Sequence, residues 1–319
     1  MIEKKLPYAL VFGVSVFDIC GFTDRNYRCN DSNPGKVKTS FGGVCRNIAE
    51  CMARVNVNTK FISILGDDEP GNRMIEHSEK MKYDMSESLI IKDGHTPTYM
   101  AILDEQGEMV SAVVDMKIID MFTTKFIDSK AEIIKNSEYM ILDSDRPDIV
   151  EYIIKTFSGE TKFILDPVSA AKAKNVKHLI SHFHTIKPNR YEAEIMCGFK
   201  IHNDEDLRKA GQYFIDLGIQ NVFITLDEDG IYYNNGTSEG KIKANNVKVV
   251  NVTGAGDSFV AGIANGYMND INVVDTVKYA IAMSTITIST EETIHPGMCD
   301  DLVEQYMDNI EWTELEYSK

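Results

Sequence analysis

The stretch that decides the fold is Val249-Val250-Asn251-Val252-Thr253-Gly254-Ala255-Gly256-Asp257-Ser258-Phe259, in which a strand ends, two glycines bracket an alanine and a helix begins. Glycine permits a tight turn and a close approach of the backbone to a ligand. The N–H groups at a helix start point outward, and the helix dipole adds positive potential. We therefore expect Thr253, Gly254, Ala255 and Gly256 to form an anion hole suited to the charge that develops on a transferred phosphoryl group.

Asp257 falls in the first turn of the predicted helix, beside this anion hole. A carboxylate at such a position can accept the proton of an attacking hydroxyl. The helix dipole predicts a low pKa for this carboxyl, which phosphoryl transfer tolerates because its loose transition state depends more on positioning than on a strong base. The alternative interpretation is a glycine-rich helix start with an aspartate as its cap.

The composition of the chain excludes several classes of protein. The chain has 319 residues with ordinary hydrophobic content, which is enough to bury a large core. Its formal net charge of -16 disfavours nucleic-acid binding as a primary role, because an acidic surface repels the phosphate backbone. No run of about 18 apolar residues occurs, and the six cysteines include no Cys-x-x-Cys pair. We expect a cytoplasmic protein with free thiols that neither enters a membrane nor binds nucleic acid.

Apolar runs of strand length alternate with helix-like stretches along the chain. This alternation favours a layered α/β fold with a mostly parallel sheet, and we expect one domain over residues 1–319. The expected strands are residues 8–14, 60–65, 139–142, 162–165, 185–187 and 222–226, and the expected helices are residues 45–55, 71–81, 147–158, 190–197, 204–217 and 256–268.

Two further segments break this alternation. Residues 37–40 and 99–114 alternate polar and apolar side chains, as antiparallel strands do, with a turn at Glu105-Gln106-Gly107. Together with the residues just after Val16, they are expected to form a small sheet that projects from the main domain. A lid over a cleft and a simple edge hairpin are equally compatible with the pattern.

A glycine pair marks a second candidate site. In Phe41-Gly42-Gly43-Val44-Cys45-Arg46-Asn47, the glycines Gly42 and Gly43 precede a helix that carries Asn47 in its first turn. The functional interpretation is a backbone platform against a polyol, with Asn47 forming hydrogen bonds to its hydroxyl groups. In isolation, an ordinary loop followed by a solvated asparagine explains the pattern better.

Two strand ends supply a third group of candidates. Asn189 follows a strand and caps a helix with Glu192 three residues on, so that a capping box is a strong alternative to a site for water or Mg²⁺ near phosphates. Thr225 and Gly230 belong to a strand end and turn, where the threonine could contact a phosphate or the turn could be structural only. A Gly-x-x-x-x-Gly-Lys run is missing, so the sequence does not support a P-loop NTPase.

Together and in this order, these motifs resemble the ribokinase-like family of carbohydrate kinases, the PfkB sugar kinases. The resemblance extends from about Tyr8 to the His295-Pro296 region. It implies a three-layer Rossmann-like fold with a central, mostly parallel sheet and a small β-sheet lid formed by residues of about 16–40 and 96–118. It also implies a kinase that uses ATP and Mg²⁺ to phosphorylate a hydroxyl of a sugar or nucleoside.

The similarity is closer to one branch of this family, the pseudouridine kinases, which phosphorylate the ribose 5′-hydroxyl of a C-nucleoside. The matching segments are residues 31–36, 166–170 and 184–190, together with 107–109 and 115–116. Another ribokinase-like kinase, acting on ribose, fructose or a purine nucleoside, is the alternative. A non-catalytic sugar or nucleoside sensor is a further alternative, which the retained Asp257 disfavours.

The resemblance implies a role for each matching residue. Asp257 would be the catalytic base, and Gly254, Ala255 and Gly256 would form the anion hole. The substrate would be held by Asp18, Gly42, Gly43 and Asn47, with Asp115 as a contact from the lid; ATP would be bound by Asn189, Thr225, Gly230 and Thr253; and Glu192 would organise Mg²⁺ through water.

Three positions depart from the family pattern. Val16 stands where an asparagine is frequent, so one sugar contact is lost or supplied otherwise. Asn251 stands where many relatives carry an aspartate at a monovalent-cation loop, so activation by K⁺ is expected to be weak. Asp227 replaces a usual glycine, which changes the detail of phosphate binding. The resemblance further implies a homodimer formed through the lid sheet.

Overall fold

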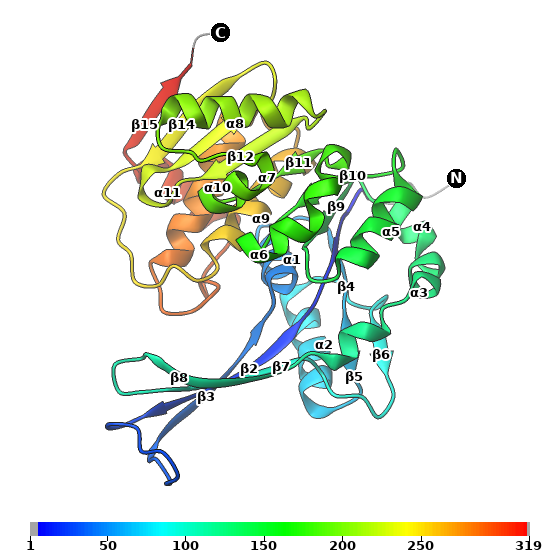
Figure 1. Cartoon of the computed structure of the whole chain (residues 1–319), viewed down its shortest axis with the longest axis vertical. Helices are drawn as coiled ribbons and strands as arrows, with labels where there is room; N and C mark the ends of the chain where they lie inside the picture. Colours follow the sequence, from blue (N-terminus) through cyan, green and yellow to red (C-terminus); the bar gives the residue numbers. More distant parts are fainter. Residues whose placement is uncertain (1–5, 318–319) are drawn as a thin grey trace.

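The structure is a computed structural model that describes residues 6–317. Within them, the main sheet has nine strands in the order β15-β14-β13-β12-β11-β10-β9-β1-β4 (Figure 1). Neighbours from β4 to β12 pair in parallel, and β13, β14 and β15 extend the sheet antiparallel at one edge. These strands are β1 Ala9–Phe12, β4 Thr59–Ile62, β9 Tyr139–Leu142, β10 Lys162–Leu165, β11 Thr185–Ile186, β12 Asn221–Thr225, β13 Ile231–Asn234, β14 Glu239–Ala244 and β15 Trp312–Glu316.

Both faces of the main sheet are covered by helices, because its central strands are apolar on both sides. Along β1, Leu10 and Phe12 pack into one core and Ala9 and Val11 into the other. The helices between residues 124 and 216 pack on the first core, and those between residues 44 and 81 and between residues 255 and 309 pack on the second. The predicted layered α/β fold is thus confirmed, with three layers.

The helices have the following bounds: α1 Val44–Arg54, α2 Glu69–Met81, α3 Thr124–Ser129, α4 Ala131–Lys135, α5 Pro147–Phe157, α6 Ala170–Val176, α7 Arg190–Cys197, α8 Asp204–Asp216, α9 Ala255–Met268, α10 Val273–Ile288 and α11 Asp300–Asn309. Short 3₁₀ helices lie at Lys117–Met121, Lys177–His182 and Asp227–Asp229. No helix in the described part of the chain combines the length and the apolar character needed to cross a bilayer.

A second sheet, called the small sheet below, projects from the body of the molecule (Figure 1). Its strand order is β3-β2-β7-β8, with bounds β2 Val16–Thr23, β3 Gly35–Gly42, β7 Thr98–Leu103 and β8 Met109–Asp115. The predicted small sheet is therefore present, but the expectation of purely antiparallel strands is wrong, because β2 and β7 pair in parallel. Both strands leave the body in the same direction, and each returns through its own antiparallel partner, β3 or β8.

The strand predicted over residues 60–65 is interrupted at Ser63. Its side-chain oxygen accepts a hydrogen bond of 2.9 Å from the backbone of Ser15, and its own N–H donates to Ser88 Oγ at 3.1 Å. The chain therefore leaves the main sheet after β4 and continues as β5 (Ile64–Gly66), which pairs with β6 (Leu89–Ile91) in a separate two-stranded sheet.

Candidate active site

The carboxyl ends of the parallel strands bring several charged side chains to one edge of the main sheet. Asp143, Asp166 and Lys187 directly follow β9, β10 and β11. In an open parallel sheet, this edge is where ligands bind. The amino ends of α1 and α9 lie at the same edge, because Asn47 on α1 is hydrogen-bonded to Asp257 on α9.

The predicted anion hole forms a tight loop at the start of α9. Gly254 has a φ of 82°, and a Cβ atom there would lie 2.1 Å from the carbonyl oxygen of Thr293. Only glycine fits this position without displacing the neighbouring backbone. A Cβ on Gly256 would lie 2.9 Å from Lys187 Nζ, so the amino group of the lysine lies directly against the loop.

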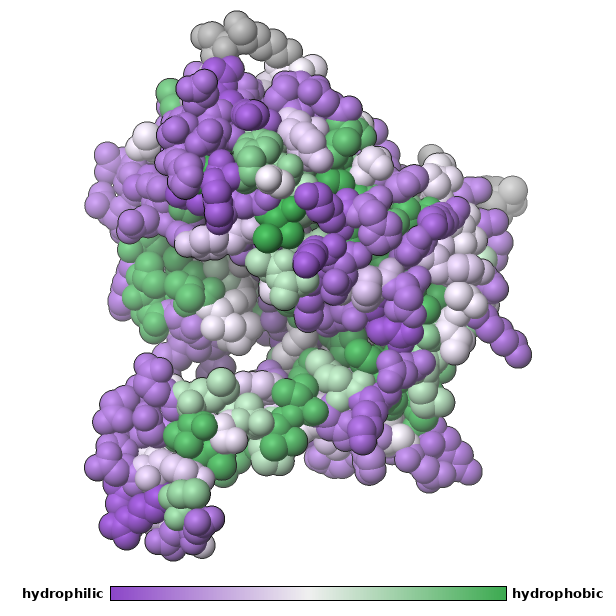
Figure 2. All heavy atoms as spheres, viewed as in Figure 1, coloured by the Kyte–Doolittle hydropathy of each residue, from purple (hydrophilic) through white to green (hydrophobic). Residues whose placement is uncertain are grey.

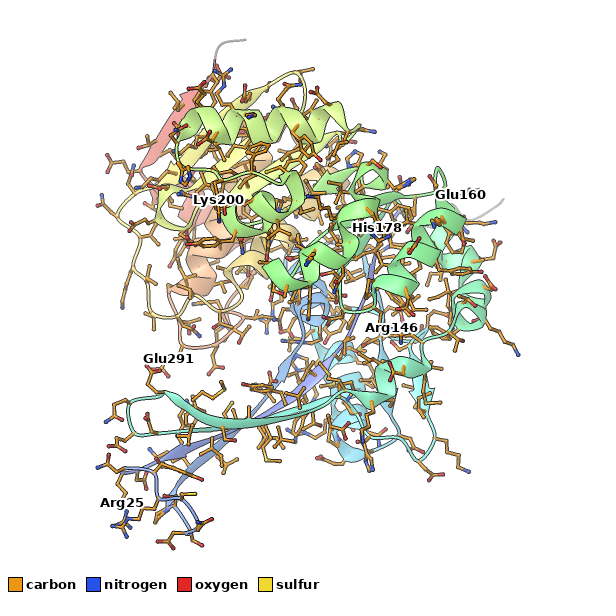
Figure 3. The ribbon with its side chains drawn as sticks, viewed as in Figure 1. Arg25, Arg146, Glu160, His178, Lys200 and Glu291 are labelled. Atoms are coloured by element: carbon orange, nitrogen blue, oxygen red, sulfur yellow. The ribbon has the colours of Figure 1, made fainter. Side chains whose placement is uncertain are left out.

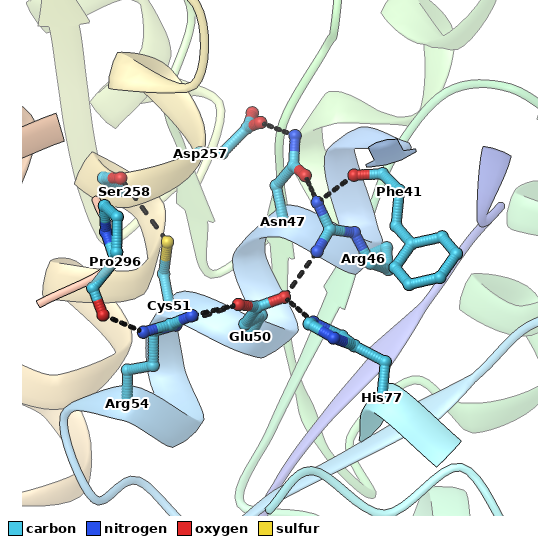
Figure 4. Close-up of polar contacts among 10 residues, drawn as sticks. All are labelled: Phe41, Arg46, Asn47, Glu50, Cys51, Arg54, His77, Asp257, Ser258 and Pro296. Atoms are coloured by element: carbon cyan, nitrogen blue, oxygen red, sulfur yellow. Dashed lines mark hydrogen bonds and ion pairs between the residues drawn. The ribbon is translucent and has the colours of Figure 1, made fainter. Parts of the chain in front are cut away.

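Asn47 and Asp257, two of the predicted site residues, are in direct contact. Asn47 Nδ2 donates a hydrogen bond of 2.6 Å to Asp257 Oδ2 (Figure 4). The start of α1 is fixed by Gly43, whose φ is 98° and where a Cβ would lie 2.2 Å from the carbonyl oxygen of Val14. The glycine before each helix thus allows the helix start to pack closely against neighbouring backbone, Val14 for α1 and Thr293 for α9.

The low pKa predicted for Asp257 is wrong. Withdrawal of the carboxyl from water, followed by the charge of Asp166, raises the pKa of Asp257 to about 7. The hydrogen bond from Asn47 and the positive charges of Lys187 and Arg46 act in the opposite direction without cancelling this rise. The helix dipole can be inferred from local sequence, whereas the burial of a side chain and its neighbours from other strands cannot.

A buried ion pair lies beside Asp257 and was not among the predicted site residues. Lys187 Nζ is 2.9 Å from Asp166 Oδ2, and their side chains are only 8% and 4% exposed. Burial alone would lower the pKa of Lys187, but Asp166 keeps it raised, so that the lysine stays charged. The sequence signal that could have identified Asp166 and Lys187 is that each directly follows a buried strand.

Asp18 lies at the base of the small sheet, against the glycine pair. A Cβ on Gly42 would lie 2.2 Å from Asp18 Oδ2, so this glycine gives the carboxylate its space. Burial raises the pKa of Asp18 to about 6, and the charge of Arg46 opposes this rise. The structure thus brings Asp18, Gly42 and Gly43 to the helix that carries Asn47.

Asp115 occupies a different place from the other predicted substrate contacts. Asp115 of β8 pairs with Thr98 of β7, and Thr98 pairs with Phe17 of β2. Asp18, the residue after Phe17, pairs instead with Tyr99. Because side chains alternate between the faces of a sheet, Asp115 lies on the face of the small sheet opposite to Asp18. The structure therefore does not bring Asp115 together with Asp18.

Three of the four residues predicted to bind ATP lie in β12 or beside its end. Asn189 forms an isolated parallel bridge with Thr225, and Thr225 N donates to the carbonyl oxygen of Pro188 at 3.0 Å. Gly230 closes the following turn with a φ of 87°, and a Cβ there would lie 2.3 Å from the carbonyl oxygen of Ile242. Thr253 is exposed just before the glycine loop.

Glu192 takes part in a capping box. Its Oε2 accepts a hydrogen bond of 2.8 Å from Asn189 N, and its own N–H donates to Asn189 Oδ1 at 2.9 Å. Burial raises the pKa of this carboxyl. In the part of the chain described, no cluster of three His, Cys, Asp or Glu side chains could hold a metal by itself. A single carboxylate is compatible with Mg²⁺, which usually keeps several waters and is held by substrate phosphates with one or two carboxylates.

A three-layer α/β body, a small projecting sheet and a glycine-rich helix start beside a carboxylate define a kinase of the ribokinase type. The chain belongs to the pfkB family of carbohydrate kinases, whose family model matches residues 7–298. The predicted family and fold class are thereby confirmed, and the chain is a sugar or nucleoside kinase of this family.

Three relatives illustrate the similarity. The pseudouridine kinase of Escherichia coli (strain K12) is 30% identical over 97% of this chain and 99% of its own length. The ribokinase of Staphylococcus aureus (strain COL) is 28% identical over 77% of this chain and 81% of its own length. A crystal structure described as that of a candidate sugar kinase from Clostridium perfringens is 60% identical, covers 99% of this chain and 100% of that one, and has a TM-score of 0.95.

Proposed function

We propose that this protein transfers the terminal phosphoryl group of ATP to the ribose 5′-hydroxyl of pseudouridine, giving pseudouridine 5′-phosphate. The observation that carries the proposal is the contact of Asn47 with Asp257 beside the glycine loop. This contact supports the proposal, because it joins the side chain proposed to bind hydroxyl groups and the proposed base beside the glycine loop. The support for pseudouridine is the similarity to the pseudouridine kinase of Escherichia coli over nearly the whole length of both chains.

In the proposed step, Asp257 accepts the proton of the substrate hydroxyl. One oxygen of its carboxylate, Oδ2, already accepts from Asn47, which leaves Oδ1 for the hydroxyl. The hydroxyl oxygen forms a bond to the terminal phosphorus, the bond from that phosphorus to the bridging oxygen breaks, and ADP leaves with the electron pair. The backbone N–H group of Gly256 and the charge of Lys187 stabilise the transferring group. The N–H group of Ala255 instead donates to the carbonyl oxygen of Val252 at 3.3 Å.

The ATP side of the site is proposed to consist of Asn189, Thr225, Gly230 and Thr253. Mg²⁺ would be organised by Glu192 through water, and it would neutralise charge on the phosphates. Potassium is proposed to have little effect on the rate. At the position of the family's monovalent-cation loop, Asn251 Nδ2 already donates to the carbonyl oxygen of Glu291 at 2.9 Å and so connects the two segments without an ion. Replacing K⁺ by Na⁺ in the assay should leave the rate nearly unchanged, and strong activation by K⁺ would contradict this.

The sugar would be bound by Asp18, Asn47 and the backbone of the glycine pair. In the register of the small sheet, Asp18 pairs with Tyr99, and Tyr99 pairs with Val114, so these three side chains share one face. An aromatic ring and an apolar side chain beside the sugar position favour an acceptor that carries a base over a free sugar. This is a second line of support for a nucleoside substrate.

A release assay for ADP with pseudouridine, uridine, ribose, adenosine and fructose 6-phosphate tests the proposal. We expect the highest kcat/KM with pseudouridine. A preference for ribose or for the sugar phosphate would refute pseudouridine and leave the family assignment intact. Ligand binding without ADP release on any acceptor would instead indicate a sensor.

The small sheet is proposed to act as a lid and as a dimer interface. Lys38 Nζ on β3 lies 4.0 Å from Glu291 of the body, which faces the small sheet (Figure 3).

Apolar side chains are visible on the small sheet in Figure 2. On its face opposite to Asp18, the side chains of Val37, Met100 and Val113 are 72%, 47% and 66% exposed. A second copy would bury this face. Sedimentation should therefore give a homodimer that Val113→Lys dissociates; a monomeric wild type would refute it.

A further inference from the structure

Arg46, which directly precedes Asn47 on α1, is buried at the base of the site with 4% of its surface exposed. Its guanidinium donates to three acceptors: the carbonyl oxygen of Phe41 at 2.5 Å, Glu50 Oε2 at 2.5 Å, and Asn47 Oδ1 (Figure 4). Phe41 belongs to β3, so one side chain connects the small sheet, α1 and the contact to Asp257.

Glu50 holds Arg46 in this place. It is 2% exposed and also accepts hydrogen bonds from Arg54 Nε at 2.9 Å and from His77 Nε2 at 2.8 Å. Although burial opposes it, these partners lower the pKa of Glu50 to about 2, so the carboxylate is charged at neutral pH. The anchor of Arg46 is therefore a permanent negative charge.

The chemistry of arginine determines how the amide of Asn47 is oriented. A guanidinium has only donors, so the atom of Asn47 that faces Arg46 must be the oxygen. The amide nitrogen then faces Asp257 and donates to its Oδ2. With the amide reversed, two oxygens would face each other at Asp257, and an N–H group would face a guanidinium.

We propose that Arg46, anchored by Glu50, is a positioning residue that fixes the amide of Asn47 so that Asp257 keeps one oxygen bound and the other free for the acceptor hydroxyl. The inference rests on the proposed function in one respect, namely that Asp257 acts on a hydroxyl. Arg46 acts through Asn47 and need not touch the substrate.

Packing alone does not account for this arrangement. Replacing a buried ion pair with apolar side chains of similar volume is often neutral or stabilising. In addition, Arg46 Nε is buried and has no hydrogen-bond partner among the residues described, which is a cost to stability. A role in the site explains why the charge is present.

The test uses Arg46→Met, Arg46→Lys and, as a matched control, Arg54→Met in the full-length protein. Like Arg46, Arg54 pairs with Glu50, and it also donates to the carbonyl oxygen of Pro296. Unlike Arg54, Arg46 donates to Asn47. We expect Arg46→Met to lower kcat by about 10- to 100-fold, as misplacement of a catalytic group does, with the KM for ATP little changed. Arg54→Met should stay close to the wild type.

A second readout needs no substrate. The carboxyl of Asp257 can be titrated by ¹³C NMR, with its signal assigned by comparison with Asp257→Asn. The charged or titratable groups that face it are Arg46 and Cys51 from α1, Asp166 after β10 and Lys187 after β11. Of these four groups, Arg46 is the one that Arg46→Met removes, so this variant should raise the titration midpoint of Asp257. Arg54→Met removes none of the four and should leave the midpoint in place.

Arg46→Lys separates charge from geometry. A lysine keeps the positive charge, which should bring the titration midpoint back toward that of the wild type. Its single ammonium group cannot reproduce the planar fork that holds Phe41, Glu50 and Asn47 together, so kcat should stay low. Free guanidinium ion added to Arg46→Gly should recover part of the lost kcat.

Equal effects of Arg46→Met and Arg54→Met on kcat, or an unmoved titration of Asp257, would overturn the proposal. If Arg46→Met does not fold, Glu50→Gln keeps the charge of Arg46 and weakens its anchor, so it should lower kcat by less than Arg46→Met and should not raise the titration midpoint. A wild type that phosphorylates none of the acceptors while the titration shifts as expected would refute the proposed function and support the positioning role. An active wild type whose kcat Arg46→Met leaves unchanged would support the proposed function and refute the positioning role.

Discussion

Asn47 Nδ2 donates a hydrogen bond of 2.6 Å to Asp257 Oδ2, although 210 residues separate the two in the sequence. The contact exists because α1 and α9 begin at the same edge of the main sheet, each after a glycine with positive φ. It joins the residue expected to bind hydroxyl groups to the residue expected to take the proton from one of them.

Replacing Asp257 with asparagine should reduce kcat by about 10²- to 10⁴-fold, because the side chain keeps its shape and loses its ability to accept a proton. Binding of the acceptor, measured by calorimetry, should change little. Asp301→Asn, in the first turn of α11 and outside the candidate site, is a suitable control and should keep full activity. Unchanged turnover in Asp257→Asn would remove this residue from the role of base.

The activity should depend on pH through Asp257. Its pKa is raised to about 7, and the group must be deprotonated to accept a proton, so kcat/KM should rise with pH below this value and level off above it. In Asn47→Ala the hydrogen bond that lowers the pKa is lost, and the midpoint should move to higher pH. A rate that is flat across the range from acid to neutral pH would show that Asp257 has the low pKa expected from the helix dipole alone.

Lys187 and Asp166 should behave as a coupled pair. Lys187→Met leaves a buried carboxylate without its partner, which should lower the free energy of unfolding by about 3–5 kcal/mol and slow phosphoryl transfer. Adding Asp166→Asn should recover part of the stability but not the activity, since the positive charge is still missing. Urea unfolding and ADP release on the two single variants and the double variant measure both effects. Additive losses of stability would mean that the pair is not coupled.

Gly254→Ala should damage the loop at the start of α9. A Cβ at this position would lie 2.1 Å from the carbonyl oxygen of Thr293, so the loop must move and kcat should fall by about 10²-fold. Gly107→Ala is a matched control, because Gly107 has a similar φ of 84° with no atom within 4 Å of its added Cβ. It should cost only the backbone strain of about 1–2 kcal/mol. Similar kcat values for the two variants would show that the loop tolerates the displacement.

Much of the fold could be predicted from local sequence. The helix over Arg190–Cys197 has the bounds that its sequence predicts, because Asn189 and Glu192 form a capping box. In the structure, Gly198 ends this helix in the left-handed conformation. The buried strands were recognisable as short apolar runs. The break at Ser63 was missed, because it depends on Ser15 and Ser88, which are distant in the sequence.

The candidate site was predictable in part. The glycine loop, Asp257 and Asn47 were recognised because each belongs to a short motif at a helix start. Lys187 and Asp166 were not, since their pairing arises only when β10 and β11 lie side by side. The face on which Asp115 lies follows from the register of β7 and β8 with β2, which no local pattern reveals.

By itself, the sequence determined the alternation of buried strands with helices, the glycines that must turn, and the family to which the chain belongs, because these depend on the periodicity of side chains and on motifs of a few residues. Only the tertiary structure decided the chemical state of the site. The raised pKa of Asp257, the charged Lys187 and the orientation of the Asn47 amide under Arg46 all result from burial and from charges that distant segments bring together. These are interactions through space, and their strength depends on how water is excluded around them.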